Sequence, residues 1–310
     1  MEKLNRMAIE LVDEALEYAE ELNVGAFELD AGTTVLDFGL DFPGGMEAGL
    51  LCTEIQTAGL ATIQRDLGRL GDATIPYVEL STDQPARALL GSQKAGWELA
   101  TDDFEGLGSG PARALVAEED IYQRMGYTEH FDLTALVVET DAEPTEAAAD
   151  QVAAFADVTP ESVFLVAFPT ASVVGSVTNA ARAAEMATYQ LCEVGYDPLD
   201  IVSASGRAPV PPVPDDEETA IARTTDAVAY GGRVHLVVDE PFDRFDEIPS
   251  SASAEYGRPF AEIYGDRDWS FEEVPADLFG PATVTVDVIG GETHTFGDVD
   301  EDLLVESFDL

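Results

Sequence analysis

Arg182 and Glu185 are the two residues whose types and spacing most directly suggest chemistry. They lie three positions apart in the segment from Gly175 to Cys192, which the sequence predicts to be one helix, so both side chains should project from the same side. A carboxylate can act as a general base, and a neighbouring guanidinium can orient it or stabilise developing negative charge. The spacing leaves open an ordinary exposed ion pair, worth about 0.3–0.5 kcal/mol.

The elements around this pair are predicted to shelter it. Small apolar residues recur at helical spacing between Val177 and Leu191 and form a packing face, and we expect the pair to lie half sheltered at its margin. An apolar run at 163–168 predicts a buried strand just before the helix. Open α/β sheets bind ligands beyond the carboxyl ends of their strands, which makes Thr170 and Ser172 candidate substrate-binding residues.

The most glycine-dense stretch, 106–115, is a second candidate binding element. Glycines and a serine ahead of a predicted helix can present backbone N–H groups to an anion, so Ser109, Gly110 and Arg113 are candidate substrate-binding residues. The stretch matches neither GxGxxG nor GxxxxGK[ST], and an ordinary tight turn remains the alternative.

Other cations stand in segments of Gly, Pro, Ser or Thr, where a solvent-facing helix would not place them. Lys94, Arg207 and Arg223 are therefore further candidates for holding an anionic ligand. The alternatives are pairing of the arginines with the abundant acids and, for Lys94, a position at the negative end of a helix dipole.

Net charge sets limits on partners and surroundings. The 310 residues carry 62 acidic and 15 basic side chains, a net charge of 62 − 15 = 47 negative, which repels nucleic acid and anionic membranes. Such a charge destabilises the compact state unless salt screens it, and the screening length at 1 M ionic strength is about 3 Å. We therefore expect a halophile's cytoplasmic protein with salt cations at its acidic surface.

The remaining composition favours a reduced, metal-free protein outside the membrane. Cys52 and Cys192 form no CxxC, and the three histidines have no metal-ligand spacing, so we expect no disulfide framework, no metal and no cofactor. No span reaches the roughly 20 apolar residues of a membrane helix. Met1-Glu2-Lys3 opens an amphipathic helix instead of a signal peptide.

Strands alternating with helices predict a mixed α/β (α+β) fold, and 310 residues suffice for two compact units as readily as for one. We divide the chain into residues 1–130 and 131–310, and the chain is free to cross between the domains. Residues 205–214, rich in proline, are predicted to be a rigid loop, and 68–71 a loop between two short strands.

Several motifs, in order and spacing along nearly the whole chain, resemble the methenyltetrahydromethanopterin cyclohydrolases of archaea. They are Glu47-Ala48-Gly49-Leu50, Gln93-Lys94-Ala95-Gly96-Trp97, Gly108-Ser109-Gly110-Pro111-Ala112-Arg113-Ala114-Leu115, Pro169-Thr170-Ala171-Ser172 with Gly175-Ser176-Val177, Tyr230-Gly231-Gly232 and Glu306-Ser307-Phe308. Two segments depart from the family: Gly206-Arg207-Ala208-Pro209 replaces a GTAP-like loop, and Ala222-Arg223-Thr224-Thr225-Asp226 a GRTND-like one.

The resemblance implies a homotrimer whose subunits have two α/β domains side by side, with a substrate cleft between them. It also implies hydrolysis of the methenyl bridge of a reduced pterin without a metal, with Arg182 and Glu185 as the catalytic residues of an ARxxE helix. Arg113 would serve the anionic tail of the substrate, and Ser176 in the Gly175-Ser176-Val177 motif is a further substrate-binding candidate. Three alternatives remain: the same reaction on a tetrahydrofolate, a small-molecule kinase that uses the glycine-rich loop, and a non-catalytic pterin carrier.

Overall fold

The computed structural model describes residues 3–267, 269 and 273–310, so Met1 and Glu2, where the first helix was predicted to open, lie outside the described residues. The chain forms two compact units. Unit 1 comprises Met1–Thr62 and Arg87–Thr178, and unit 2 comprises Ile63–Ala86 and Asn179–Leu310. The division does not follow the predicted boundary after residue 130, because the strands at 134–168 pair with strands from the start of the chain.

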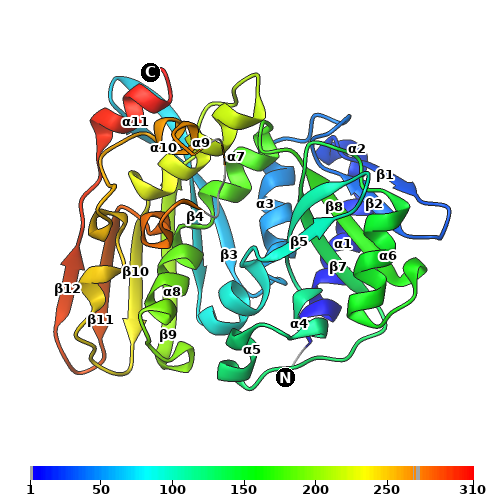
Figure 1. Ribbon diagram of the computed structural model, residues 1–310, viewed down its shortest axis with the longest axis horizontal. Helices are drawn as coiled ribbons and strands as arrows, with labels where there is room; N and C mark the ends of the chain where they lie inside the picture. Colours follow the sequence, from blue (N-terminus) through cyan, green and yellow to red (C-terminus); the bar gives the residue numbers. More distant parts are fainter. Residues whose placement is uncertain (1–2, 268, 270–272) are drawn as a thin grey trace. The chain divides into compact units, whose positions relative to one another are not determined.

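Unit 1 is built on a mixed six-stranded sheet in the order β1-β2-β8-β7-β6-β5 (Figure 1). Its centre, β2-β8-β7, is parallel, and the outer pairs are antiparallel. Alternate residues of β7, Leu136 and Val138, join a core cluster with α6, while Val137 between them is equally buried. The sheet is thus covered on both faces, as parallel strands require.

The elements of unit 1 begin and end as follows: α1 Leu4–Glu17, α2 Ala19–Leu22, β1 Gly25–Glu28, β2 Thr34–Asp37, α3 Met46–Gln56, the π-helix η1 Ala86–Gln93, β5 Trp97–Ala100, β6 Glu105–Ser109, α4 Arg113–Val116, α5 Asp120–Met125, β7 Thr134–Glu139, α6 Glu146–Ala156, η2 Pro160–Ser162, β8 Val163–Phe168, and α7 Val173–Ala180, which leads into unit 2.

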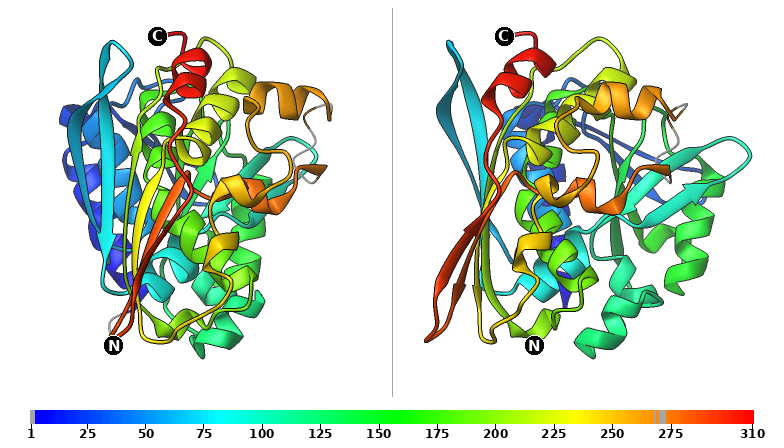
Figure 2. Two further views of the ribbon diagram at one scale, coloured as in Figure 1. Left: turned by 90° about the vertical axis from the view of Figure 1, so that its left-hand side faces the viewer. Right: turned by 60° about the vertical axis from the view of Figure 1, so that its left-hand side comes forward.

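Unit 2 carries a second six-stranded sheet, in the order β12-β11-β10-β9-β4-β3. The second view of Figure 2 shows α8, α9 and α10 on one side of this sheet. Inward residues such as Val234 and Leu236 on β10 are buried, whereas Arg233 and His235, which alternate with them, are exposed. Such alternation is typical of a largely antiparallel sheet whose own helices cover only one face.

The elements of unit 2 begin and end as follows: β3 Thr62–Leu70, β4 Ala73–Thr82, α8 Ala183–Glu193, η3 Pro198–Asp200, β9 Ile201–Pro209, α9 Glu217–Ala229, β10 Arg233–Val238, η4 Phe245–Glu247, η5 Ser250–Ala252, α10 Phe260–Gly265, η7 Ala276–Phe279, β11 Thr283–Val288, β12 Thr293–Phe296 and α11 Glu301–Ser307.

The mixed α/β fold class is confirmed, but three local predictions were wrong. Residues 205–209 continue β9 instead of forming a loop, because β9 pairs with β10 up to Arg207 and with β4 up to Pro209, which ends the strand. Gly68 lies within β3, since β3 and β4 form one long hairpin. Gly106 and Gly108 lie in β6 instead of in a loop ahead of a helix.

The helix predicted from Gly175 to Cys192 is interrupted. α7 ends at Ala180 and α8 begins at Ala183, and between them the Arg182 N–H donates to the Asn179 carbonyl (3.1 Å), a tighter turn than an α-helix makes. Within the described part of the chain, no helix is long and apolar enough to cross a membrane.

Candidate functional site

Arg182 and Glu185 form a buried pair at the start of α8. Arg182 is the N-cap residue and Glu185 lies in the first turn, with 3.3 Å between Arg182 Nη1 and Glu185 Oε2. Their side chains are only 5% and 3% exposed, so the predicted half-sheltered position was wrong, and the pair is no surface ion pair. Because burying two charges costs several kcal/mol per ion before they attract each other, this arrangement is weak evidence for stability and a reason to look for function.

Gly206 on β9 lets the first turn of α8 approach the sheet. A Cβ at this position would lie 2.5 Å from the Ala184 nitrogen and 2.9 Å from the Ala184 Cβ. Ala184 stands between the two members of the pair. Only glycine therefore allows α8 to hold Arg182 and Glu185 where they are.

Gly206→Ala should destabilise the protein by about 1–3 kcal/mol and lower turnover, because the added methyl group must push α8 away from β9. Urea unfolding and kcat, both at molar salt, measure the two effects. Gly265→Ala is the matched control, since a Cβ there meets no atom within 4 Å. Equal behaviour of the two variants would remove Gly206 from the site.

A cavity of about 110 Å³ adjoins Arg182. Its walls come from Arg182 and Met186 at the start of α8, from Phe279, and from α9, which contributes Thr224, Thr225, Val228 and Ala229. The cavity is therefore a partly polar space with apolar walls beside Arg182.

In unit 1, Arg113 is held by the protein itself. Its Nε and Nη2 donate to Glu119 Oε1 (2.9 and 2.7 Å), and its Nη1 donates to the carbonyls of Leu90 and Ser92 (3.2 and 3.1 Å). Lys94 Nζ donates to the other oxygen of Glu119 (3.0 Å). Burial raises the pKa of Glu119, but the charges of Arg113 and Lys94 outweigh it and hold the pKa below its ordinary value. An anion reaching Arg113 would have to replace the Glu119 carboxylate.

Ser109 and Gly110 belong to the same network. Gln56 donates to Ser109 Oγ (3.1 Å), and Ser92 Oγ donates to the Gln56 carbonyl (2.6 Å). Gly110 has φ +100°, a conformation that favours glycine, and its N–H donates to the Ser92 carbonyl (2.7 Å). The structure thus brings Lys94, Ser109, Gly110 and Arg113 together around the end of the π-helix η1.

Thr170, Ser172 and Ser176 follow β8, as predicted. Thr170 Oγ1 donates to Glu139 Oε1 (2.6 Å) at the end of the neighbouring strand β7. Ser172 Oγ accepts from the Gly175 N–H (2.9 Å) and donates to the Pro169 carbonyl (2.7 Å), so this hydroxyl shapes the start of α7. Ser176 is buried within α7.

Arg207 and Arg223 stand apart from each other in unit 2. The Arg207 guanidinium stacks on Tyr77, 4.1 Å from the ring centroid, and approaches Asp66 (3.6 Å). Arg223 on α9 donates to the Ser307 carbonyl (2.9 Å) and to Asp309, which ties α9 to the end of the chain. Each arginine thus contacts an acidic residue, as the alternative of pairing with the abundant acids predicts.

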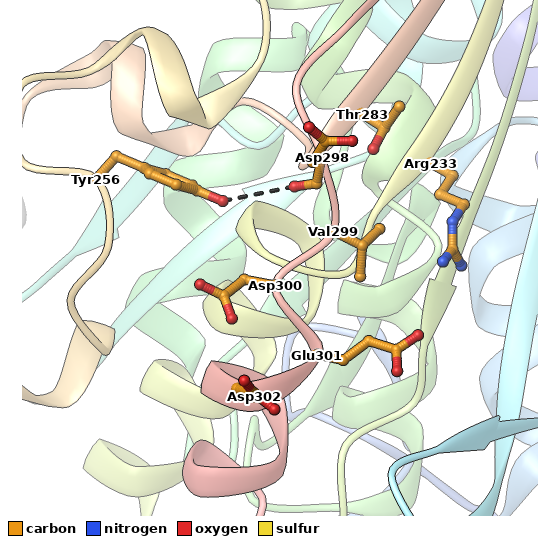
Figure 3. A pocket seen from close by; sticks show the side chains of 8 residues that line it. All are labelled: Arg233, Tyr256, Thr283, Asp298, Val299, Asp300, Glu301 and Asp302. Atoms are coloured by element: carbon orange, nitrogen blue, oxygen red, sulfur yellow. Dashed lines mark hydrogen bonds between the residues drawn. The ribbon is translucent and has the colours of Figure 1, made fainter.

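A broad surface hollow in unit 2 is acidic (Figure 3). Asp298, Asp300, Glu301 and Asp302 line it together with a single arginine, Arg233. The negative charge of these side chains repels an anionic ligand and attracts cations. Among the described residues, no group of three or more His, Cys, Asp or Glu side chains is placed to hold a metal ion.

Sequence reasoning missed Gly206 and Glu119. A glycine amid strand-forming residues marks a close backbone approach, so Gly206 had a signal that the prolines after it obscured. Glu119 had none: it is one acidic residue among 62, and only the fold shows that it joins Arg113 to Lys94.

Comparison with known proteins places the whole chain among cyclohydrolases. The family model described as "Cyclohydrolase (MCH)" matches residues 3–308. The chain is similar to the methenyltetrahydromethanopterin cyclohydrolase of Halobacterium salinarum, with 60% identity over 310 residues and all of both chains covered. It is also similar to those of Methanothermobacter marburgensis (37%, all of both chains) and Methanospirillum hungatei (36%, 99% of each).

Proposed function

Since the chain belongs to the methenyltetrahydromethanopterin cyclohydrolase family, we propose that it reversibly hydrolyses the methenyl bridge of methenyl-tetrahydromethanopterin to the formyl-pterin in one-carbon metabolism. The observation that carries a residue-level mechanism is the buried Arg182–Glu185 pair at the start of α8. Glu185 is the general base, and Arg182 assists it.

In this mechanism, water adds to the cationic methenyl carbon, which bridges two nitrogens. Glu185 takes a proton from the water, and a tetrahedral adduct forms. One C–N bond then breaks as the hydroxyl group of the adduct loses its proton to solvent water and becomes the formyl carbonyl. The departing nitrogen receives a proton, for which protonated Glu185 is the donor, so one proton is released overall. Arg182 holds the Glu185 carboxylate and stabilises developing negative charge on the oxygen.

The test is loss of the methenyl chromophore at molar salt, followed with purified protein. The tetrahydromethanopterin and tetrahydrofolate compounds are assayed at equal concentrations. We expect a much larger kcat/KM for the methanopterin compound. A preference for the folate compound would change the carrier and keep the chemistry, whereas binding of either compound without hydrolysis would make the protein a carrier.

Salt cations at the acidic surface are part of the proposal. The acidic hollow of Figure 3 gathers four carboxylates against one arginine, and the chain as a whole carries 47 net negative charges. Mutual repulsion of this kind weakens as salt shortens the screening length.

Dilution of KCl from about 3 M to about 0.1 M should lower Tm by about 5 °C or more, equivalent to roughly 2 kcal/mol, because the carboxylates are then unscreened. Differential scanning calorimetry along a KCl series measures the change. Sucrose in place of KCl serves as a control that adds solute without screening charge. An unchanged Tm across the series would contradict the prediction that the protein is halophilic.

We also propose a cytoplasmic homotrimer. The proposal rests on the resemblance to archaeal cyclohydrolases, and the unit 2 sheet has one face that its own helices do not cover. Light scattering at molar salt should give three times the chain mass of 33.1 kDa, and a monomer mass would refute it.

A further inference from the structure

Asp226 is a fully buried carboxylate that the proposed mechanism does not use. It lies on α9, whose neighbouring residues Thr224 and Thr225 line the cavity beside Arg182. Its Oδ1 accepts the N–H of Phe260, the first residue of α10, at 3.0 Å. Its Oδ2 accepts the hydroxyl of Ser307, the last residue of α11, at 2.6 Å. One carboxylate thus fastens two further helices to α9.

These contacts reach two walls of the cavity. Phe260 packs on Phe279, with ring centroids 5.7 Å apart, and Phe279 lines the cavity. The hydroxyl of Tyr264 on α10 lies 3.3 Å from Thr225 Oγ1 on the α9 wall. A change at Asp226 is therefore passed on through α10 to the cavity that Arg182 lines.

We propose that Asp226 is a positioning residue for the catalytic pair: by clamping α10 and α11 to α9 it sets the shape of the cavity beside Arg182. The inference rests on the proposed function, because Asp226 would act on the reaction through Arg182.

The clamp also responds to protons. Burial raises the pKa of Asp226 to about 7, while the hydrogen bonds from Ser307 and Phe260 oppose the rise. The Phe260 N–H needs an acceptor in either state. The Ser307 hydroxyl, which donates to the ionised carboxylate, must accept from the protonated one. Protonation therefore reverses the direction of the α11 hydrogen bond and weakens the α10 hydrogen bond, because the acceptor of the Phe260 N–H loses its charge.

Few other charges surround Asp226. Tyr230 directly follows α9. Burial, and to a smaller extent the charge of Asp226, raise its pKa to about 12, so Tyr230 stays neutral near pH 7. Arg223 on the same helix is bound to Asp309 beyond α11. Towards α10, Arg258 pairs with Glu262 and Asp266. Glu306 on α11 is exposed.

The test observes the cavity without substrate. Met186 lines the cavity and is one of five methionines, so methyl-labelled methionine NMR can follow it, with assignment by Met186→Leu. In the wild type its methyl resonance should titrate with a midpoint near pH 7. Asp226→Asn should abolish the titration. Ser307→Ala should raise the midpoint, because the lost hydrogen bond favours the ionised form.

Glu218→Gln, the same chemical change at an exposed position of α9, is the control and should titrate like the wild type. In the assay, Asp226→Asn should lower kcat by between about tenfold and 100-fold with little change in KM, and kcat should lose its dependence on pH near neutrality. If Asp226→Asn does not fold, the midpoint of the Met186 titration in Ser307→Ala tests the proposal.

A Met186 resonance that does not titrate in the wild type, or that titrates unchanged in Asp226→Asn or Ser307→Ala, would overturn the proposal. Titration that Asp226→Asn abolishes, in a protein that hydrolyses neither methenyl compound, would support the clamp and refute the proposed function instead.

Discussion

Glu185→Gln should lower kcat by about 10²–10⁴-fold, because the amide keeps the shape of the side chain and cannot take a proton from water. The Glu185 side chain is 3% exposed, and its carboxylate contacts Arg182. The loss should appear in kcat more than in KM, since the proton is transferred only in the chemical step. The decrease of methenyl absorbance at molar salt measures both constants.

A matched control for this experiment is Glu193→Gln at the other end of α8. Glu193 is exposed on the same helix and should keep wild-type turnover. Circular dichroism and Tm then check that both variants are folded. Near wild-type turnover in folded Glu185→Gln would show that another group is the base, and the mechanism would have to be rebuilt.

Glu119→Gln should cost about 3 kcal/mol of stability, because it leaves the 1%-exposed Arg113 guanidinium without its counter-charge. The backbone carbonyls of Leu90 and Ser92 would still accept from Arg113, but they bring no negative charge. Glu119 itself is 33% exposed, which places the effect at the lower end of what breaking a buried pair costs. Urea unfolding at molar salt and neutral pH measures the difference.

The pH dependence of the stability that Glu119 contributes gives an independent check. The pKa of Glu119 is lower in the folded protein than its ordinary 4.5, so the stability that its ionised form contributes is present above pH 4.5 and is lost as the pH falls through the folded value. The difference between wild type and Glu119→Gln should therefore shrink in acid. Glu98 is an exposed carboxylate that lines a surface hollow of unit 1 together with Arg113 and Glu119, and Glu98→Gln should show no such difference from the wild type. Equal unfolding of the two variants would refute the structural role of Glu119.

Local signals predicted the elements that depend on neighbours in the sequence. The apolar run at 163–168 is β8, with the predicted bounds, and the acidic residues ahead of α9 include Asp216, whose carboxylate caps that helix by accepting the Thr219 N–H (2.9 Å). The same signals failed at 205–209. There, proline and glycine suggest a loop, but two partner strands from distant parts of the chain pair with the segment and keep it extended.

The sequence predicted that Arg182 and Glu185 lie close together, but it did not predict that both are buried. Spacing placed Arg182 and Glu185 on one side of a helix, and that proximity holds although the helix breaks between Ala180 and Ala183. Their burial depends on Gly206, which approaches Ala184 from β9, and no periodicity within α8 reports that contact.

By itself the sequence determined the family motifs, the strongly acidic surface and the identity of the catalytic candidates, because composition and short-range spacing are properties of the chain alone. Only the tertiary structure decided which charges leave water and which partners they meet. It holds Arg113 with Glu119 and two carbonyls, Arg223 with the end of the chain, and Asp226 between α10 and α11. The physical reason is that burial and pairing depend on residues far apart in sequence, which packing alone brings together.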